Sequence, residues 1–316
     1  MKMDAAVLSQ LVAARMSEAR SCAHVTAIAS LDPGEQADLL KELHAVEPGR
    51  APFLSFLMGT RKCGNPCNQM RSFLDSVLEM TDEVEGIEIL ARIDQDDDLY
   101  YYRDIRREYA GRLNLRFVVG DRGRGYEDLH RFVHELVAHI SPSSMAIFGC
   151  SDDSYLAKKG WDSSARQVIR HYPDNLFFVN SGRNLKMPYD NLEAFFRSLW
   201  TMGPSAPFPI IGRRVFEIIQ ETVAPLEGWT TFGNSVMADS FFEAIQMYLW
   251  RVAGVQRTVQ LQGIICQHVE VISGAHKEGN PWQHPIAIRS YQEFVTPQTQ
   301  KVIMSIARAL AGQVSC

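Results

Sequence analysis

Short apolar runs alternate with amphipathic segments from residue 52 onward. The apolar run at 53–58, for example, is followed by a segment at 69–80 whose apolar residues recur at helical spacing. This alternation is typical of a mostly parallel sheet covered by helices, so we predict an α/β fold. The predicted strands are 53–58, 87–93, 115–119, 145–149 and 176–180, with an extended run at 259–271. The predicted helices are 35–46, 69–80, 126–139, 192–200, 213–223 and 239–252.

The two ends of the chain carry helix start signals. Asp32-Pro33-Gly34-Glu35 combines an N-cap, a first-turn proline and an acid at the third position, and Thr296-Pro297 opens a last helix in the same way. We therefore predict a helical N-terminal extension at 1–50, an α/β domain at 51–272 and a C-terminal tail with a helix at 273–316. The α/β domain divides into a first half at 51–165 and a second half at 166–272.

Composition narrows the choice of partners and compartment. The 316 residues carry a formal net charge of −5, so no overall basic field exists to hold nucleic acid, which is not the default partner. Six cysteines without an export signal predict reduced thiols. No apolar run approaches the ~20 residues that a membrane-spanning helix needs. A cytoplasmic protein is the expectation.

Polar residues follow three of the predicted strands. They lie at 59–62 after the first strand, at 94–98 after the second and at 151–154 after the fourth. Ligands of open parallel sheets bind beyond the carboxyl ends of the strands, so these residues are candidates for a site. A single acidic turn is more often a helix cap or an Asx-turn. Carboxylates ~4 Å apart repel by roughly 1–4 kcal/mol, however, and two acidic turns at strand ends favour a shared divalent ion. Hard oxygen ligands of this kind suit Mg²⁺ or Mn²⁺.

Five stretches carry a resemblance to a known family. They are Ser55-Phe-Leu-Met-Gly-Thr-Arg61, Phe73-Leu-Asp-Ser-Val-Leu78, Ile87-Glu-Ile-Leu-Ala-Arg-Ile-Asp94-Gln-Asp-Asp-Asp98, Gly120-Asp-Arg-Gly-Arg-Gly-Tyr126 and Phe148-Gly-Cys-Ser-Asp-Asp-Ser-Tyr-Leu-Ala-Lys-Lys-Gly-Trp-Asp162. Over about residues 52–165 the chain resembles GT-A glycosyltransferases of the family-two type. The resemblance implies a Rossmann-like GT-A fold and transfer of a sugar from a nucleotide-diphospho-sugar. Mn²⁺ or Mg²⁺ would stabilise the leaving diphosphate.

The resemblance also implies roles for individual residues. Thr60 and Arg61 would line the nucleoside pocket, and Asp94 would meet the base or ribose with Asp96 close by. Arg122 would approach the base or diphosphate. Asp152 would contact the ribose or sugar and Asp153 the metal. The metal motif reads Ser151-Asp152-Asp153 where the commonest family form is Asp-x-Asp, a departure that concerns metal affinity.

Two further roles fall in the second half. His268 and His276 are both candidates for a downstream metal ligand, and the sequence leaves the choice between them open. An inverting enzyme also needs a general base near the acceptor, for which Asp239 is the candidate. The competing interpretation of Asp239 is an ordinary helix N-cap, worth about 1 kcal/mol.

Two other functions stay open. A sugar-phosphate nucleotidyltransferase needs a Gly-rich phosphate loop with a lysine, of which Gly59-Thr60-Arg61-Lys62 is a fragment. A non-catalytic, nucleotide-sugar-binding relative would explain Ser151 and the unassigned N-terminal helices. The donor (a UDP- or GDP-sugar), the acceptor, the stereochemistry and a homo-oligomeric state are not determined.

Overall fold

The computed structural model describes residues 28, 31–62, 68–180, 209–234, 238–261, 266–268, 292 and 294–314. The α-helices are α2 (Pro33–His44), α3 (Met70–Met80), α4 (Leu99–Tyr109), α5 (Leu129–Glu135), α6 (Trp161–His171), α8 (Arg213–Val223), α9 (Ala238–Ala253) and α12 (Pro297–Gln313). The 3₁₀ helices are η2 (Val84–Gly86), η3 (Gly125–Asp128) and η4 (Leu136–His139). The strands are β1 (Leu54–Gly59), β2 (Ile87–Asp94), β3 (Asn114–Gly120), β4 (Ala146–Ser151), β5 (Ser154–Leu156), β6 (Phe178–Asn180), β7 (Ile210–Gly212), β8 (Thr258–Gln260) and β9 (Cys266–His268).

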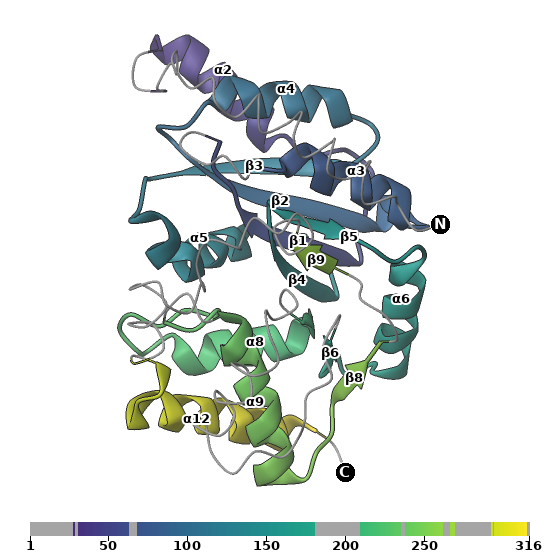
Figure 1. The fold of residues 1–316 in the computed structure, drawn as a ribbon, viewed down its shortest axis with the longest axis vertical. Helices are drawn as coiled ribbons and strands as arrows, with labels where there is room; N and C mark the ends of the chain where they lie inside the picture. The colour runs from purple at the N-terminus through teal and green to yellow at the C-terminus, as the bar shows by residue number, and fades with distance from the viewer. Residues whose placement is uncertain are drawn as a thin grey trace, which may run out of the picture.

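Seven strands form one mixed sheet in the order β3-β2-β1-β4-β7-β6-β8. The first four pair in parallel, whereas β7 is antiparallel to both β4 and β6. Figure 1 shows β3, β2, β1 and β4 following one another in that order through the molecule. The order 3-2-1-4 is also that of the first four strands of a Rossmann sheet, in which the strand order reverses between β1 and β4. A crevice at the carboxyl ends of β1 and β4 is the place where such a sheet binds ligands.

Alternating strand residues divide the core between the two faces of the sheet. Phe56 and Phe148 lie on one face, where Trp161 of α6 packs against both rings. Leu57 and Leu90 lie on the other face, which is covered by α5 and by the group of α8, α9 and α12. In Figure 1 these last three helices gather at the end of the molecule away from α2 and α4. Burial on both faces explains why the strands are nearly continuous apolar runs.

Helix α2 is held against α4 by polar contacts. Asp32 caps α2 by accepting from the backbone of Gly34 and Glu35 at 2.9 and 3.1 Å. The Arg107 guanidinium of α4 then donates to both carboxylate oxygens of Glu42. The expected cap of the last helix is also present, because Thr296 accepts from the backbone of Thr299 at 3.2 Å. Both start signals are therefore confirmed.

The predicted fold class is confirmed, with local differences. The helix expected at 126–139 is split into η3, α5 and η4, and the extended run at 259–271 contains only the short strands β8 and β9 within its described part. Helices α4 and α6 and strands β5 and β7 have no counterpart among the predicted elements. The helix expected at 192–200 lies outside the described residues. Within the described part of the chain, no helix has the length and apolar character to cross a membrane.

Candidate functional site

Three loops meet at the carboxyl edge of the sheet. Because β2 and β4 both run parallel to β1, the last residue of β1, Gly59, lies opposite Arg92 on one side and Ser151 on the other. This register brings residues 94–98 (the Asp94 turn) and residues 151–154 (the Asp152 turn) to one edge. The two acidic turns therefore open on the same side of the molecule, as the sequence predicts.

Thr60 and Asn68 hold Asp152 at the point where the sheet reverses its order. The Thr60 hydroxyl donates to Asp152 Oδ2 at 2.7 Å, and the Asn68 amide donates to the same oxygen at 3.1 Å. Asp152 is 7% exposed. Burial disfavours its charged form, and the neighbouring Asp153 adds repulsion, so that the pKa of Asp152 rises to about 7. Among the described residues, no cation pairs with this carboxylate.

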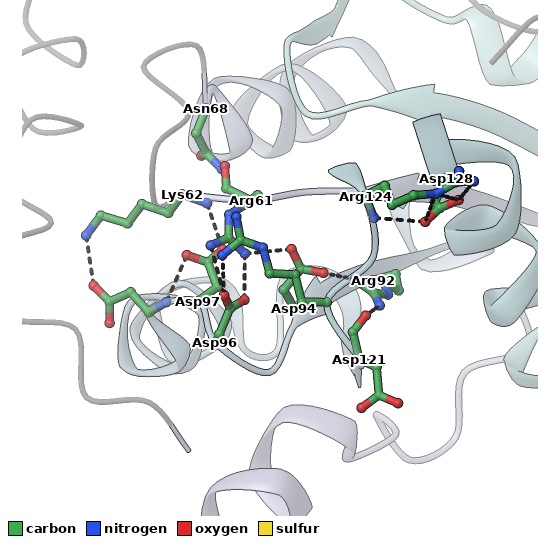
Figure 2. Close-up of polar contacts among 12 residues, drawn as sticks. Arg61, Lys62, Asn68, Arg92, Asp94, Asp96, Asp97, Asp121, Arg124 and Asp128 are labelled. Carbon is green, nitrogen blue, oxygen red and sulfur yellow. Dashed lines mark hydrogen bonds and ion pairs between the residues drawn. The ribbon is translucent and has the colours of Figure 1, made fainter. Parts of the chain in front are cut away.

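Three arginines from outside the Asp94 turn bind its carboxylates. Arg61 donates to Asp94 at 2.6 Å and to both oxygens of Asp96 at 2.7 and 3.3 Å, and Figure 2 shows its guanidinium between the two carboxylates. Arg122 donates to Asp96 at 2.7 Å, and Arg92 pairs with Asp94. The bond from Arg61 and that from Arg122 lower the pKa of Asp96, although its partial burial opposes the shift. Burial alone would lower the pKa of Arg61, but the bonds to Asp96 and Asp94 raise it.

This arrangement corrects the electrostatic argument made from the sequence. The repulsion expected within the Asp94 turn is relieved by side-chain cations of the protein, so a divalent ion is not needed there. The remaining acids of the turn have local tasks. Asp98 caps α4 by accepting from the backbone of Tyr101 at 3.1 Å and also binds Lys62 at 3.0 Å. Asp97 is fully buried and accepts from the Tyr102 hydroxyl at 2.8 Å.

The Asp152 turn carries the residues that the sequence predicts near a metal. The Ser151 hydroxyl contacts the Asp153 carboxylate, which places two hard oxygen donors together. Strand β9 pairs with β5 so that His268 lies opposite Ser154, one residue after Asp153. Within the described ranges, no three His, Cys, Asp or Glu side chains converge on a possible metal position. The side chain of His268 and the whole of His276 lie outside those ranges.

Asp239 lies at the second position of α9, and its side chain is outside the described set. The loop that precedes α9 packs on α5, the helix that follows the carboxyl edge of β3. His134 Nδ1 lies 2.9 Å from the Thr231 hydroxyl, and Thr230 donates to the His130 carbonyl at 3.4 Å. These contacts bring the approach to α9 to the α5 side of the sheet.

Two residues of the site are absent from the sequence-based candidates. Asn68 bonds the Thr60 hydroxyl, the Arg61 carbonyl and Asp152 at once, and nothing in its local sequence marks it. Arg92 lies in the middle of an apolar strand and is 2% exposed. A charge at a buried strand position is a signal that the sequence does offer, because such a group has to find partners.

Comparisons with known proteins give fold-level likeness only. No protein-family model and no curated protein sequence matches the chain. Similar solved structures include S. aureus TarS, at 12% identity and a TM-score of 0.45 over 77% of this chain and 42% of TarS. TarS 1–349 in complex with UDP-GlcNAc aligns at 12% identity and a TM-score of 0.44, over 83% of this chain and 81% of that one. The mannosyltransferase PcManGT from Pyrobaculum calidifontis, in complex with GDP-Man and Mn²⁺, aligns at 13% identity and a TM-score of 0.43, over 98% of this chain and 88% of that one.

The chain therefore spans less than half of the TarS chain in its longer form.

Proposed function

We propose that the protein transfers a sugar from a nucleotide-diphospho-sugar to an acceptor hydroxyl at the carboxyl edge of its sheet. One observation carries the proposal. Thr60 and Arg61, consecutive residues after β1, reach the two acidic turns, at 2.7 Å to Asp152 and 2.6 Å to Asp94. A continuous set of polar contacts therefore runs across three strand ends at the switch point of the sheet, where α/β proteins bind nucleotides. Its mixture of cations and carboxylates suits a ligand with both phosphates and sugar hydroxyls.

The residues divide the tasks by position. Asp94 and Asp96 would lie on the nucleoside side; they hold Arg61 and Arg122, whose cations would meet a base or a diphosphate. Arg122 suits this role because its side chain is 61% exposed while one of its nitrogens is anchored on Asp96. Asp152, buried and oriented by Thr60 and Asn68, would contact the ribose or sugar.

Asp153, with the hydroxyl of Ser151, would hold Mn²⁺ or Mg²⁺, and His268 is the third candidate ligand. When bound, such an ion would stabilise the negative charge of the departing nucleoside diphosphate. The backbone register of β5 and β9 supports this set because it brings residue 268 beside the turn that carries Asp153.

Asp239 remains the candidate general base for an inverting reaction. Its support is positional: the contacts of Thr230 and Thr231 with α5 bring the start of α9 toward the face of the sheet that α5 covers.

The division of the chain into an extension, two half-domains and a tail is likewise part of the proposal.

Donor binding can be tested by titrating UDP and GDP into the purified protein, each with and without Mn²⁺, and following the melting temperature and the heat of binding. A ligand at 100 times its dissociation constant adds roughly 2.7 kcal/mol of stability, which such a measurement resolves easily. We expect Asp153→Ala to abolish the metal-dependent part of binding. Asp104→Ala is a matched control, because it removes an exposed carboxylate from α4, away from the edge.

The outcomes separate the remaining functions. A nucleotide affinity that changes neither on addition of Mn²⁺ nor in Asp153→Ala would contradict the proposed metal site. Tight binding without transfer or hydrolysis of any common sugar nucleotide would favour a non-catalytic relative. Release of pyrophosphate from a nucleoside triphosphate and a sugar phosphate would identify a nucleotidyltransferase.

A further inference from the structure

Arg92 is a buried cation whose guanidinium has a separate partner for each of its nitrogens. Nη1 pairs with Asp94, Nε lies 3.1 Å from Glu135 Oε2, and Nη2 donates to the carbonyl of Asp121. The partners come from β2, from the end of α5 and from the loop after β3. The guanidinium also lies over the Phe132 ring, 4.1 Å from its centroid. Figure 2 shows Arg92 between Asp94 and Asp121.

The loop after β3 fits closely around this cation. A Cβ atom on Gly120 would lie 2.9 Å from both Nε and Nη2 of Arg92. A Cβ atom on Gly123 would lie 2.6 Å from the Phe132 ring. Glycine at both positions therefore lets the loop backbone approach the guanidinium and the ring beneath it. The same loop carries Arg122, the exposed cation that Asp96 anchors.

We propose that Arg92 is the positioning residue of the donor site, which fixes the Asp94 carboxylate and the 121–124 loop relative to each other. The inference rests on the proposed function, because it assumes that Asp94 and Arg122 address the same nucleotide. Arg92 thereby fixes the distance between Asp94 and Arg122. This distance determines how well a given nucleobase and its diphosphate bind at the same time. Lysine cannot replace it, since an ammonium is a point charge and lacks the planar fork that reaches three partners in fixed directions.

The chain offers a matched control on the same pair of strands. Arg116 of β3 donates to the buried carboxylate of Glu88 in β2 at 2.9 Å. Glu88 lies six residues before Asp94, or about 20 Å along an extended strand, at the opposite edge of the sheet. Arg116→Lys and Arg92→Lys therefore make the same change to a buried guanidinium that binds a carboxylate, one far from the site and one within it.

Two measurements on these variants test the role of Arg92. The first is the dissociation constants of UDP and GDP, and the ratio between them. The second, which needs no ligand, is limited trypsin digestion, with fragments ending at Arg122 and Arg124 quantified by mass spectrometry. We expect Arg92→Lys to weaken binding of the preferred nucleotide about tenfold, as for the loss of one hydrogen bond to a charged group. The dissociation constants of UDP and GDP should also become more similar. Cleavage in the loop accelerates, since local opening exposes the backbone. Arg116→Lys lowers the melting temperature but changes neither readout.

The two readouts keep the inference and the proposed function apart. If the unchanged protein binds neither nucleotide, the proposed function fails and the donor-site role of Arg92 fails with it, while the rate of loop cleavage still decides whether Arg92 fixes the 121–124 loop. If it binds a nucleotide and Arg92→Lys binds it equally well, the positioning role is wrong while the function stands. Should Arg92→Lys not fold, Glu135→Ala removes a single, half-exposed partner of the same guanidinium. This variant is expected to change both readouts in the same direction as Arg92→Lys, but by less. If neither readout changes, the inference is overturned.

Discussion

His130 is expected to make the folded protein sensitive to mild acid. The residue lies near the start of α5, is 6% exposed and has a buried Nδ1 with no hydrogen-bond partner. Burial disfavours the imidazolium and lowers the pKa of His130 to about 4 from an ordinary value of 6.5, although Asp128 acts in the opposite direction. The folded protein therefore keeps this ring neutral over a range in which the unfolded chain protonates it.

The direction and size of the effect follow from proton linkage. Between about pH 6.5 and pH 4 the unfolded state binds the proton and the folded state does not, so the free energy of unfolding falls as the pH falls through this window. Above about pH 6.5 the ring is neutral in both states, so His130 no longer makes the free energy of unfolding depend on pH. The difference between an ordinary pKa of 6.5 and one of about 4, at roughly 1.4 kcal/mol per pH unit, sets an upper limit of about 3.5 kcal/mol.

Urea unfolding of the protein and of His130→Leu, each above pH ~7 and near pH ~4.5, measures this contribution. We expect the variant to gain on the unchanged protein by up to about 3 kcal/mol at the acid end relative to the neutral end, because leucine cannot take up a proton. His171→Leu, at an exposed position at the end of α6, controls for the loss of a histidine in general. A difference between the protein and His130→Leu that stays the same at both pH values would refute the reasoning.

Two further changes test the core and the site. Trp161→Ala is expected to lower the free energy of unfolding in urea by about 3–5 kcal/mol, because the ring is fully buried and its Nε1 donates to Thr81 at 3.1 Å; a loss below about 1 kcal/mol would place this ring outside the core. Asp96→Asn is expected to weaken nucleotide binding in calorimetry, because Arg61 and Arg122 lose the carboxylate that holds both; unchanged affinity would mean that neither cation depends on Asp96 for its position.

The elements that the sequence predicts well are those with a strong local signal. Strands β1, β2 and β4 are apolar runs buried along almost their whole length, and β3 is buried mainly in its first half. Helices α2 and α12 begin with a side-chain cap and a proline. Helix α4 lacks such clarity, because its start signal, Asp98, belongs to a run of acids that also reads as a ligand-binding turn. Helix α6 begins after Gly160 at a positive φ of 69° with no side-chain cap, so nothing local marks its start.

The sequence by itself places acidic turns at the ends of two strands, and since parallel strands share one carboxyl edge, it also determines that these turns meet. What neutralises them is decided only in the folded protein. Arg61 reaches a carboxylate 33 residues away, and Arg92 bonds a carbonyl 29 residues away. Such pairs depend on strand register and on the helices behind the sheet. Neither the strand register nor the position of these helices can be deduced from the order of charges along the chain, because ion pairs form between groups that are close in space.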